Sequence, residues 1–225
     1  LKLLHFLLVQ RSRWVPKEVI LEAIWPGSAP SKAENNLRQT IHLLRRALEP
    51  PGADPRSFRY VRFRNDACQL DLGEGGSFDA DVFQRRVHEG NALLDRSRPG
   101  EAEAMLRSAI DLYGGDLLEE YPYEEFLESA REDLRDRYLR ALEKLIAICS
   151  RGSRWDDVIP LCRRGLARDP YSDPFAWNLI HALLRRGDRT EALKVYRRFE
   201  ESLTAEFDLL PSARLRELAE RALRS

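Results

Sequence analysis

The sequence predicts a mainly α-helical protein built from two parts of different character. Apolar residues recur at helical spacing along most of the chain, whereas residues 58–72 alternate as β-strands do. The charge is also uneven, because residues 1–73 carry 12 Lys and Arg against 7 Asp and Glu, a formal charge of +5, and residues 74–225 carry −5. A length of 225 residues allows two small domains, and their opposite charges indicate different partners.

The composition excludes several classes of protein. Apolar residues make up 43% of the chain, yet no run approaches the about 20 apolar residues that a membrane span needs. The three cysteines and four histidines lie far apart and show no metal-ligand spacing. We therefore expect a cytoplasmic protein without metal or cofactor. The chain starts at Leu1 in the middle of a helical pattern, so we also expect that it is a piece of a longer chain.

Two short helices are predicted first. The first has its apolar residues at Leu3, Leu4, Leu7 and Leu8. Pro16 is well placed in the first turn of the second, and Trp25-Pro26-Gly27 ends it. The stripe expected to be buried in the second helix is Val19, Ile20, Ala23 and Ile24.

A third, longer helix is predicted at about residues 32–48. Ser31 and Glu34 match a capping box at its start. At 100° per residue, one narrow sector of this helix is apolar and should face the core. That stripe consists of Leu37, Ile41, Leu44 and Leu48.

The rest of this helix carries amides and cations, and no acid stands between Glu34 and Glu49. A solvated helix face usually mixes both signs of charge. Asn and Gln can bond adenine in the major groove, and Arg or Lys can bind guanine or phosphate. The pattern favours a DNA-binding face, with an ordinary solvated face as the alternative. The residues on this face and its flanks are Lys32, Asn35, Asn36, Arg38, Gln39, His42, Leu43, Arg45 and Arg46.

A basic β-hairpin is predicted next. Residues 58–64 alternate bulky and basic side chains, Asn65-Asp66 is a turn dipeptide, and residues 67–72 alternate again. Arg62 and Arg64 would share one face of the first strand. Three helices and a basic hairpin form the arrangement of a winged helix-turn-helix, in which the third helix enters the major groove and the hairpin reaches the backbone or minor groove. Arg62, Arg64 and Asn65 are therefore further candidate contacts.

Residues 14–50, WVPKEVILEAIWPGSAPSKAENNLRQTIHLLRRALEP, resemble the DNA-binding domain of SARP-type bacterial transcriptional activators. The resemblance implies that three amides, Asn35, Asn36 and Gln39, face bases. It also implies that Arg45, Arg46 and Arg62 contact phosphates. The sequence departs from the family at the wing turn, where residues 65–68 replace the usual Gly-Tyr pair, and the family's N-terminal strands are missing.

Residues 74–225 are expected to form helical pairs. Arg151-Gly152 and Arg186-Gly187 each end a predicted helix, 35 residues apart. A period near 34 is typical of tetratricopeptide repeats, which stack into a superhelix and leave a concave surface for partners. From Phe78 onward, motifs such as GDRTEAL and the Asp-Pro before a helix resemble the bacterial transcriptional activator domain, which follows the winged helix in the same activators.

The sequence thus predicts a winged helix-turn-helix at residues 1–73, lacking its N-terminal strands, and a tetratricopeptide-like activator domain at 77–225. The expected function is sequence-specific binding of double-stranded DNA and activation of transcription, without catalysis. The resemblance further implies direct repeats near promoters as targets and RNA polymerase as a partner, in a nucleoid-associated protein. The helical domain could also form homo-oligomers.

Two alternatives stay open. The first is a protein-interaction scaffold, in which the basic half is a structural cap; such a scaffold does not need the acid-free face between Asn35 and Arg46. The second is an enzyme that uses the helical domain as a substrate platform. The sequence shows no nucleophile–base or metal spacing to support an enzyme.

Overall fold

The computed structural model describes residues 1–10, 13–50, 52, 54, 58–73 and 76–224. These residues fall into two compact units. The first unit comprises residues 1–81 and 115–134, and the second comprises residues 82–114 and 135–225. The predicted mainly α fold class is confirmed, since all elements outside one small sheet are helical in the described part of the chain.

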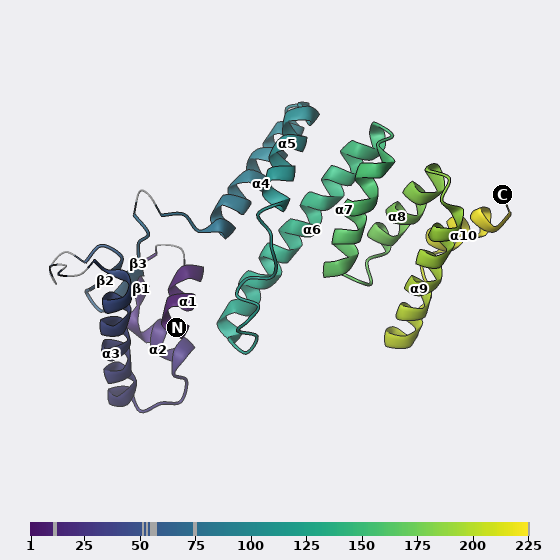
Figure 1. The fold of residues 1–225 in the computed structure, drawn as a ribbon. Coiled ribbons are helices and arrows are strands. Elements are labelled where there is room, and N and C mark those ends of the chain that lie inside the picture. The colour runs from purple at the N-terminus through teal and green to yellow at the C-terminus, as the bar shows by residue number, and fades with distance from the viewer. Residues whose placement is uncertain (11–12, 51, 53, 55–57, 74–75, 225) are drawn as a thin grey trace. The chain divides into compact units, whose positions relative to one another are not determined.

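The first unit is a winged helix (Figure 1). Its elements are α1 (Lys2–Val9), β1 (Val15–Pro16), α2 (Lys17–Ile24), α3 (Pro30–Leu48), β2 (Val61–Arg64) and β3 (Ala67–Leu70). The three strands form an antiparallel sheet in the order β1-β3-β2, with Val15 opposite Cys68 and Val61 opposite Leu70. The sequence did not predict β1, because two residues are too short to show an alternating pattern.

The predicted hairpin is confirmed, with strands shorter than the predicted 58–64 and 67–72. Asn65 and Asp66 at its tip both have positive φ values, 48° and 55°. Two consecutive left-handed residues form the type of turn whose twist matches that of the flanking strands. Asn and Asp tolerate this conformation best among residues other than Gly. The dipeptide therefore replaces the Gly of the related wings without losing the turn.

Apolar residues from the three helices and the sheet form one core in this unit. Its most buried side chains are those of Leu3, Leu7, Ile20, Leu37, Val61 and Cys68. Two predicted core positions are wrong, because Val19 is 49% exposed and Leu48 is 37% exposed. Leu48 is the last residue of α3, where the chain turns, and the next side chain, Glu49, is the buried one. Ala33 is buried instead at the start of the stripe.

The predicted capping box at the start of α3 is also wrong. The helix begins at Pro30 with Ala29 as its N-cap, and no side chain caps it. Proline is favoured in the first turn of a helix because its φ is already helical. The helix therefore starts before Ser31, which lies inside it, and Glu34 instead pairs with Lys17, with 3.3 Å between nitrogen and oxygen.

Residues 115–134 pack with the first unit, although helices of the second unit flank them in sequence. They include a 3-10 turn, η1 (Glu125–Leu127), and the start of α6. His5 Nδ1 of α1 lies 2.9 Å from Glu124 Oε2, and both side chains are buried. The rings of Phe6 and Phe126 meet edge to face, with centroids 5.3 Å apart. These contacts tie η1 to α1, which local sequence patterns do not reveal.

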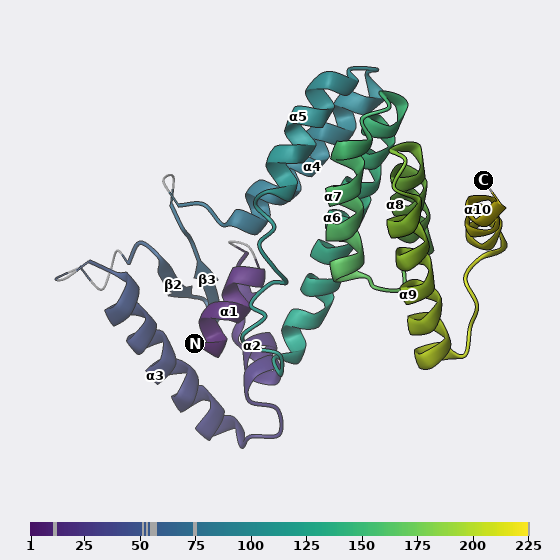
Figure 2. The same ribbon diagram turned by 45° about the vertical axis from the view of Figure 1, so that its right-hand side comes forward.

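The second unit consists of helical pairs (Figures 1 and 2). The helices that contribute to it are α4 (Asp79–Asp95), α5 (Pro99–Ile110), α6 (Glu128–Arg151), α7 (Trp155–Arg168), α8 (Asp173–Arg185), α9 (Arg189–Phe207) and α10 (Ala213–Arg224). In both views α7, α8 and α9 stand next to one another in chain order. The pairs α6–α7 and α8–α9 match the predicted repeat of about 35 residues. None of the helices within the described residues is long and apolar enough to cross a membrane.

A glycine allows α7 and α8 to pack closely. A Cβ built on Gly165 of α7 would lie 2.6 Å from the ring of Phe175 on α8, which is itself fully enclosed. We expect Gly165→Ala to destabilise the second unit by about 1–3 kcal/mol, because overpacking a core forces neighbouring side chains to move. The measurement is urea unfolding followed by circular dichroism.

Gly100→Ala is the matched control for this prediction. Gly100 also lies in a helix, but a Cβ there meets nothing within 4 Å. Alanine is the better helix former by about 1 kcal/mol, so this variant should be neutral or stabilised. Equal stability of the two variants would contradict the packing argument.

Candidate nucleic-acid interface

The predicted contact face of α3 lies at the surface of the first unit. In Figure 2, α3 runs along the outside of this unit. The apolar stripe of Leu37, Ile41 and Leu44 faces the core, so residues half a turn away point outward. Asn36 is half-buried. The exposed side chains are those of Lys32, Asn35, Arg38, Gln39, His42, Leu43 and Arg46.

Leu43 gives this polar face an apolar centre. Its side chain is 60% exposed, although leucine is among the residues most often buried. The amide side chains of Gln39 and Asn36 lie about one turn and two turns before it on the same side of the helix. An arrangement of amides beside one exposed apolar side chain matches the edge of an A·T pair, which offers adenine N6 and N7 and the thymine methyl group.

Arg45 has a different position from the other arginines. It is half-buried, its Nε donates a hydrogen bond to the carbonyl oxygen of Val61 at 2.9 Å, and its guanidinium lies 4.1 Å from the centre of the Phe58 ring. Burial lowers the pKa of Arg45, against the opposing effect of Glu49. The side chain therefore joins the end of α3 to β2.

Glu49 is the residue that sequence reasoning missed. Its buried carboxylate accepts hydrogen bonds from three successive backbone N–H groups, those of Arg59 at 2.9 Å, Tyr60 at 2.7 Å and Val61 at 3.0 Å. Burial alone would raise the pKa of Glu49, but these three donors and Arg45 lower it overall. An acid immediately after a helix and ahead of a basic strand was the available signal.

The wing is held by contacts on both sides. On β2, Arg62 pairs with Asp71 at 3.0 Å, and the guanidinium of Arg64 lies 4.3 Å from the centre of the Trp14 ring. Arg62, Arg64 and Asn65 are all exposed. Stacking or pairing fixes each guanidinium while leaving N–H groups at its edge for a phosphate.

Lys17 ties the wing turn to the helices. Its ammonium group lies 3.3 Å from carboxylate oxygens of both Asp66 and Glu34, and its backbone N–H donates to the carbonyl oxygen of Asp66 at 2.7 Å. Hydrogen bonds to these two acids raise the pKa of Lys17. The tip of the wing and the start of α3 are thus joined through the first residue of α2.

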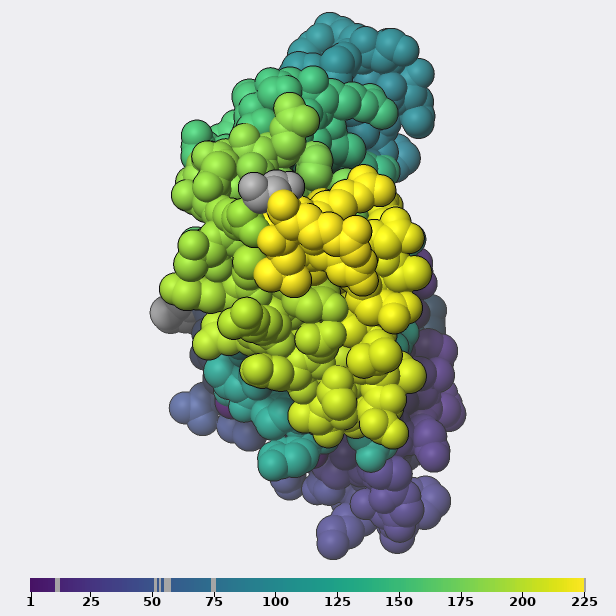
Figure 3. All heavy atoms as spheres, turned by 90° about the vertical axis from the view of Figure 1, so that its right-hand side faces the viewer, coloured from purple at the N-terminus to yellow at the C-terminus, as the bar shows by residue number. Residues whose placement is uncertain are grey.

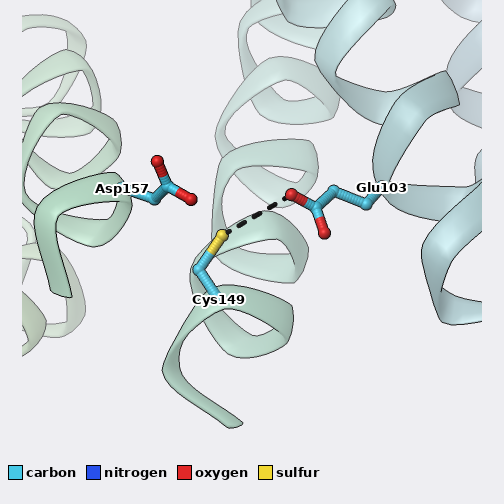
Figure 4. Close-up of side chains that lie close together, drawn as sticks. All are labelled: Glu103, Cys149 and Asp157. Carbon is cyan, nitrogen blue, oxygen red and sulfur yellow. Dashed lines mark hydrogen bonds between the residues drawn. The ribbon is translucent and has the colours of Figure 1, made fainter. Parts of the chain in front are cut away.

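Another cluster of chemically active side chains lies in the second unit (Figure 4). Ligand atoms of Glu103, Cys149 and Asp157 lie within 4.8 Å of one another, close enough for a metal ion. Two guanidinium groups already bind both carboxylates: Arg154 contacts Glu103 at 2.6 Å, and Arg107 contacts Asp157 at 3.2 Å. This arrangement fits an ion-pair network that joins α5, α6 and α7.

The pKa values in this cluster agree with that interpretation. The hydrogen bond from Arg154 holds the pKa of Glu103 below its usual range, against the opposing effect of burial. Burial raises the pKa of the Cys149 thiol. A protonated thiol beside two carboxylates that are already paired with arginines is a poor set of metal ligands, because metals bind the thiolate.

A winged helix whose α3 has no acid between Glu34 and Glu49, followed by helical pairs, is the architecture of a transcriptional regulator. Comparison with protein families agrees: residues 1–64 match the transcriptional regulatory protein C-terminal domain, and residues 78–223 match the bacterial transcriptional activator domain. The chain belongs to the bacterial transcriptional activator domain family. With both domains in this order, it is a SARP-type transcriptional regulator, as its sequence resemblance implied.

The chain is also similar to individual regulators. It is 26% identical to the transcriptional regulatory protein MoaR1 of Mycobacterium tuberculosis, covering 98% of this chain and 70% of MoaR1. It is 25% identical to the regulatory protein DnrI of Streptomyces peucetius, covering 97% and 81%. A solved structure of Mycobacterium tuberculosis EmbR in complex with a low-affinity phosphopeptide has the same fold, with a TM-score of 0.76 and 24% identity. This chain is covered to 99% and spans 58% of that EmbR chain.

The Glu49 carboxylate yields a prediction on stability. Because its folded-state pKa is lowered, its contribution is present above the unfolded-state pKa and is lost as the pH falls through the folded-state value. We expect Glu49→Gln to cost about 1–3 kcal/mol at neutral pH, since one charged acceptor of three N–H groups is replaced by a neutral amide. Urea unfolding of wild type and variant from neutral pH to about pH 3 measures the difference, which should shrink on acidification.

The control for this prediction is Glu22→Gln. Glu22 lies on α2 with an exposed side chain, so its stability difference should be small at every pH. A Glu49→Gln difference that stays constant down to acid pH would show that the charge of the carboxylate does not matter.

Proposed function

We propose that this regulator binds double-stranded DNA sequence-specifically, with α3 in the major groove and the wing on the adjacent backbone or minor groove. The observation that carries this proposal is the exposed face of α3 from Lys32 to Arg46, which has amides, cations and an exposed Leu43 but only Glu34 as an acid. Glu34 is half-buried and pairs with Lys17 of the same unit, so its negative charge is partly compensated.

The residues divide into three roles in this proposal. Asn35, Asn36 and Gln39 read base edges, with His42 and Leu43 beside them. Lys32, Arg38, Arg46, Arg62, Arg64 and Asn65 contact the sugar-phosphate backbone, which fixes the register of the helix on the duplex. Arg45 could reach a phosphate only with the part of its guanidinium that Val61 and Phe58 leave accessible, so its main role here is to position the wing.

The second half of the proposal is activation of transcription through recruitment of RNA polymerase. Residues 1–73 would supply DNA binding, and residues 77–225 would contact polymerase subunits, in a cytoplasmic, nucleoid-associated regulator without catalytic activity. The target would be direct repeats near promoters. The charge of −5 on residues 74–225 supports this division, because it disfavours contact of the helical pairs with a polyanion.

Fluorescence anisotropy of the chain with pooled promoter duplexes at several salt concentrations tests the proposal. Selected duplexes should bind more tightly than scrambled ones of equal length. A lack of binding to every duplex would instead favour the interaction scaffold.

The cationic side chains predict a steep salt dependence. If the interface neutralises about four to five phosphates, log K should fall with log[salt] with a slope of roughly −3 to −5, because each neutralised phosphate releases counterions. A slope near zero would rule out this surface as the binding site.

Two substitutions on α3 separate base reading from backbone contact. Gln39→Ala should cost about 1–3 kcal/mol on the preferred duplex and relax specificity at one A·T position. Arg46→Ala should weaken specific and scrambled duplexes about equally and lower the salt slope by about one. The measurement is a paired anisotropy titration of both duplexes.

Both variants should keep wild-type helicity, since neither side chain belongs to the buried stripe of α3. If Gln39→Ala lost affinity equally on both duplexes, Gln39 would contact the backbone. The orientation of α3 in the groove would then be different from the one proposed.

A further inference from the structure

Three helices of the second unit bring aromatic rings and guanidinium groups into one stack. Trp155 of α7 and His181 of α8 meet edge to face with centroids 5.3 Å apart, and His181 lies nearly parallel to Trp177 at 4.9 Å. The guanidinium of Arg185 lies 5.4 Å from the centre of the Trp155 ring, and that of Arg214 lies 3.8 Å from Trp177. The stack therefore has a cation at each end and three rings between. We name these five side chains the cationic stack.

The two cations of the stack are exposed and not neutralised. For Arg185 and Arg214 the described part of the chain supplies no carboxylate partner, whereas the neighbouring Arg186 pairs with Asp156 and Asp188. Stacking covers the face of a guanidinium and leaves its N–H edge available for a carboxylate. The helix α10, which supplies Arg214, lies at the surface in Figure 3 (yellow).

The pKa of the histidine in the stack also reflects the two neighbouring cations. Burial lowers the pKa of His181, and the charges of Arg185 and Arg214 lower it further. The region around the rings thus has a positive potential that an acidic ligand would compensate.

The first unit carries a surface of matching chemistry. Tyr123, ahead of η1, is 92% exposed, although tyrosine usually buries most of its ring. Glu120 and Glu125 on either side of it are exposed and have no ion-pair partner among the described residues. We name Glu120, Tyr123 and Glu125 the acidic knob.

The acidic knob is held rigidly. Arg131 donates hydrogen bonds to the carbonyl oxygens of Leu117, Leu118 and Tyr121 at 2.7–2.9 Å, which folds the segment around one guanidinium. On the other side of the segment, the buried pair of Glu124 and His5 anchors it to α1. A rigid surface loses little conformational entropy when it binds, which favours its use as a contact.

We propose that the acidic knob of one copy of this chain docks on the cationic stack of a second copy. Glu120 and Glu125 would pair with Arg185 and Arg214, and the ring of Tyr123 would lie against the aromatic rings between them. A carboxylate on each side of a ring complements a row of rings with a cation at each end. DNA is the less suitable occupant, because residues 74–225 carry a formal charge of −5 and a duplex presents phosphates continuously.

This contact is head-to-tail, because two different surfaces meet. Each copy carries both surfaces, so copies can associate into closed rings or into open chains, according to the rotation between neighbouring copies. This association does not depend on DNA and goes beyond the proposed function. If that function also holds, copies in the same orientation would suit the direct repeats proposed as targets.

Sedimentation equilibrium of the whole chain without DNA, over a series of concentrations, tests the proposal. The average mass of the wild type should rise with concentration. Arg185→Glu/Arg214→Glu and Glu120→Arg/Glu125→Arg should each weaken self-association about tenfold or more, since each replaces two attractive pairs with repulsive ones. Tyr123→Ala should also weaken it. An equimolar mixture of the two charge-reversed variants should restore association, because each reversed surface then meets its complement.

The matched control is Arg197→Glu/Arg198→Glu, which makes the same charge change at two exposed positions of α9 outside the stack. It should associate as the wild type does. Circular dichroism checks that each variant is folded. If the loss of the Arg214 contact with Trp177 disturbs α10, the knob variants still test whether the two surfaces associate.

Three results would overturn the proposal. They are a wild type that stays monomeric at every concentration, charge-reversed variants that associate like the wild type, and a mixture that does not recover. DNA binding is measured separately by anisotropy. A regulator that binds duplex but does not self-associate would contradict only this inference, and one that self-associates without binding duplex would contradict only the proposed function.

Discussion

The carboxylate of Glu49 is the contact on which the geometry of the winged helix depends. α3 and β2 are separated by residues 49–60, so the helix and the wing could take different relative orientations if nothing joined their ends. Glu49 binds the backbone N–H groups of residues 59–61, and Arg45, one turn earlier, binds the carbonyl oxygen of Val61. Together the two side chains fix where β2 begins relative to the last turn of α3.

That constraint matters because the two elements would contact the same ligand. Base reading requires the amides of α3 at hydrogen-bond distance from base edges, and backbone contacts set the register in which this occurs. A wing that moved independently would place Arg62 and Arg64 against variable phosphates and would fix no register. Lys17 acts in the same way at the other end of the wing, where it joins Asp66 to Glu34. The ionic side chains that hold this geometry, Glu49, Arg45 and Lys17, therefore form their contacts within the unit. The exposed cations remain available for phosphates.

The sequence could predict the parts of this architecture that repeat with a period. Helical spacing located the three helices and the direction of the α3 face, since Leu37, Ile41 and Leu44 are indeed buried. Helical spacing did not predict features that depend on one or two residues. Pro30 started α3 before the expected Ser31 cap, and β1 is too short for any pattern. The role of Glu49 depends on three N–H groups about ten residues away in the chain, which only the folded structure brings together.

The same distinction applies to the helical pairs. Their period identified the repeat, but the packing of residues 115–134 with α1 depends on a contact between His5 and Glu124, 119 residues apart. The family match at 78–223 treats this segment as part of the activator domain, whereas its side chains complete the unit that contains the winged helix. A change in the packing of that segment would therefore alter the position of α1, which shares its core with α3 through Leu3 and Leu7. The boundary in sequence and the boundary in packing differ because a domain's core is defined by which apolar surfaces meet, and Phe6 meets Phe126.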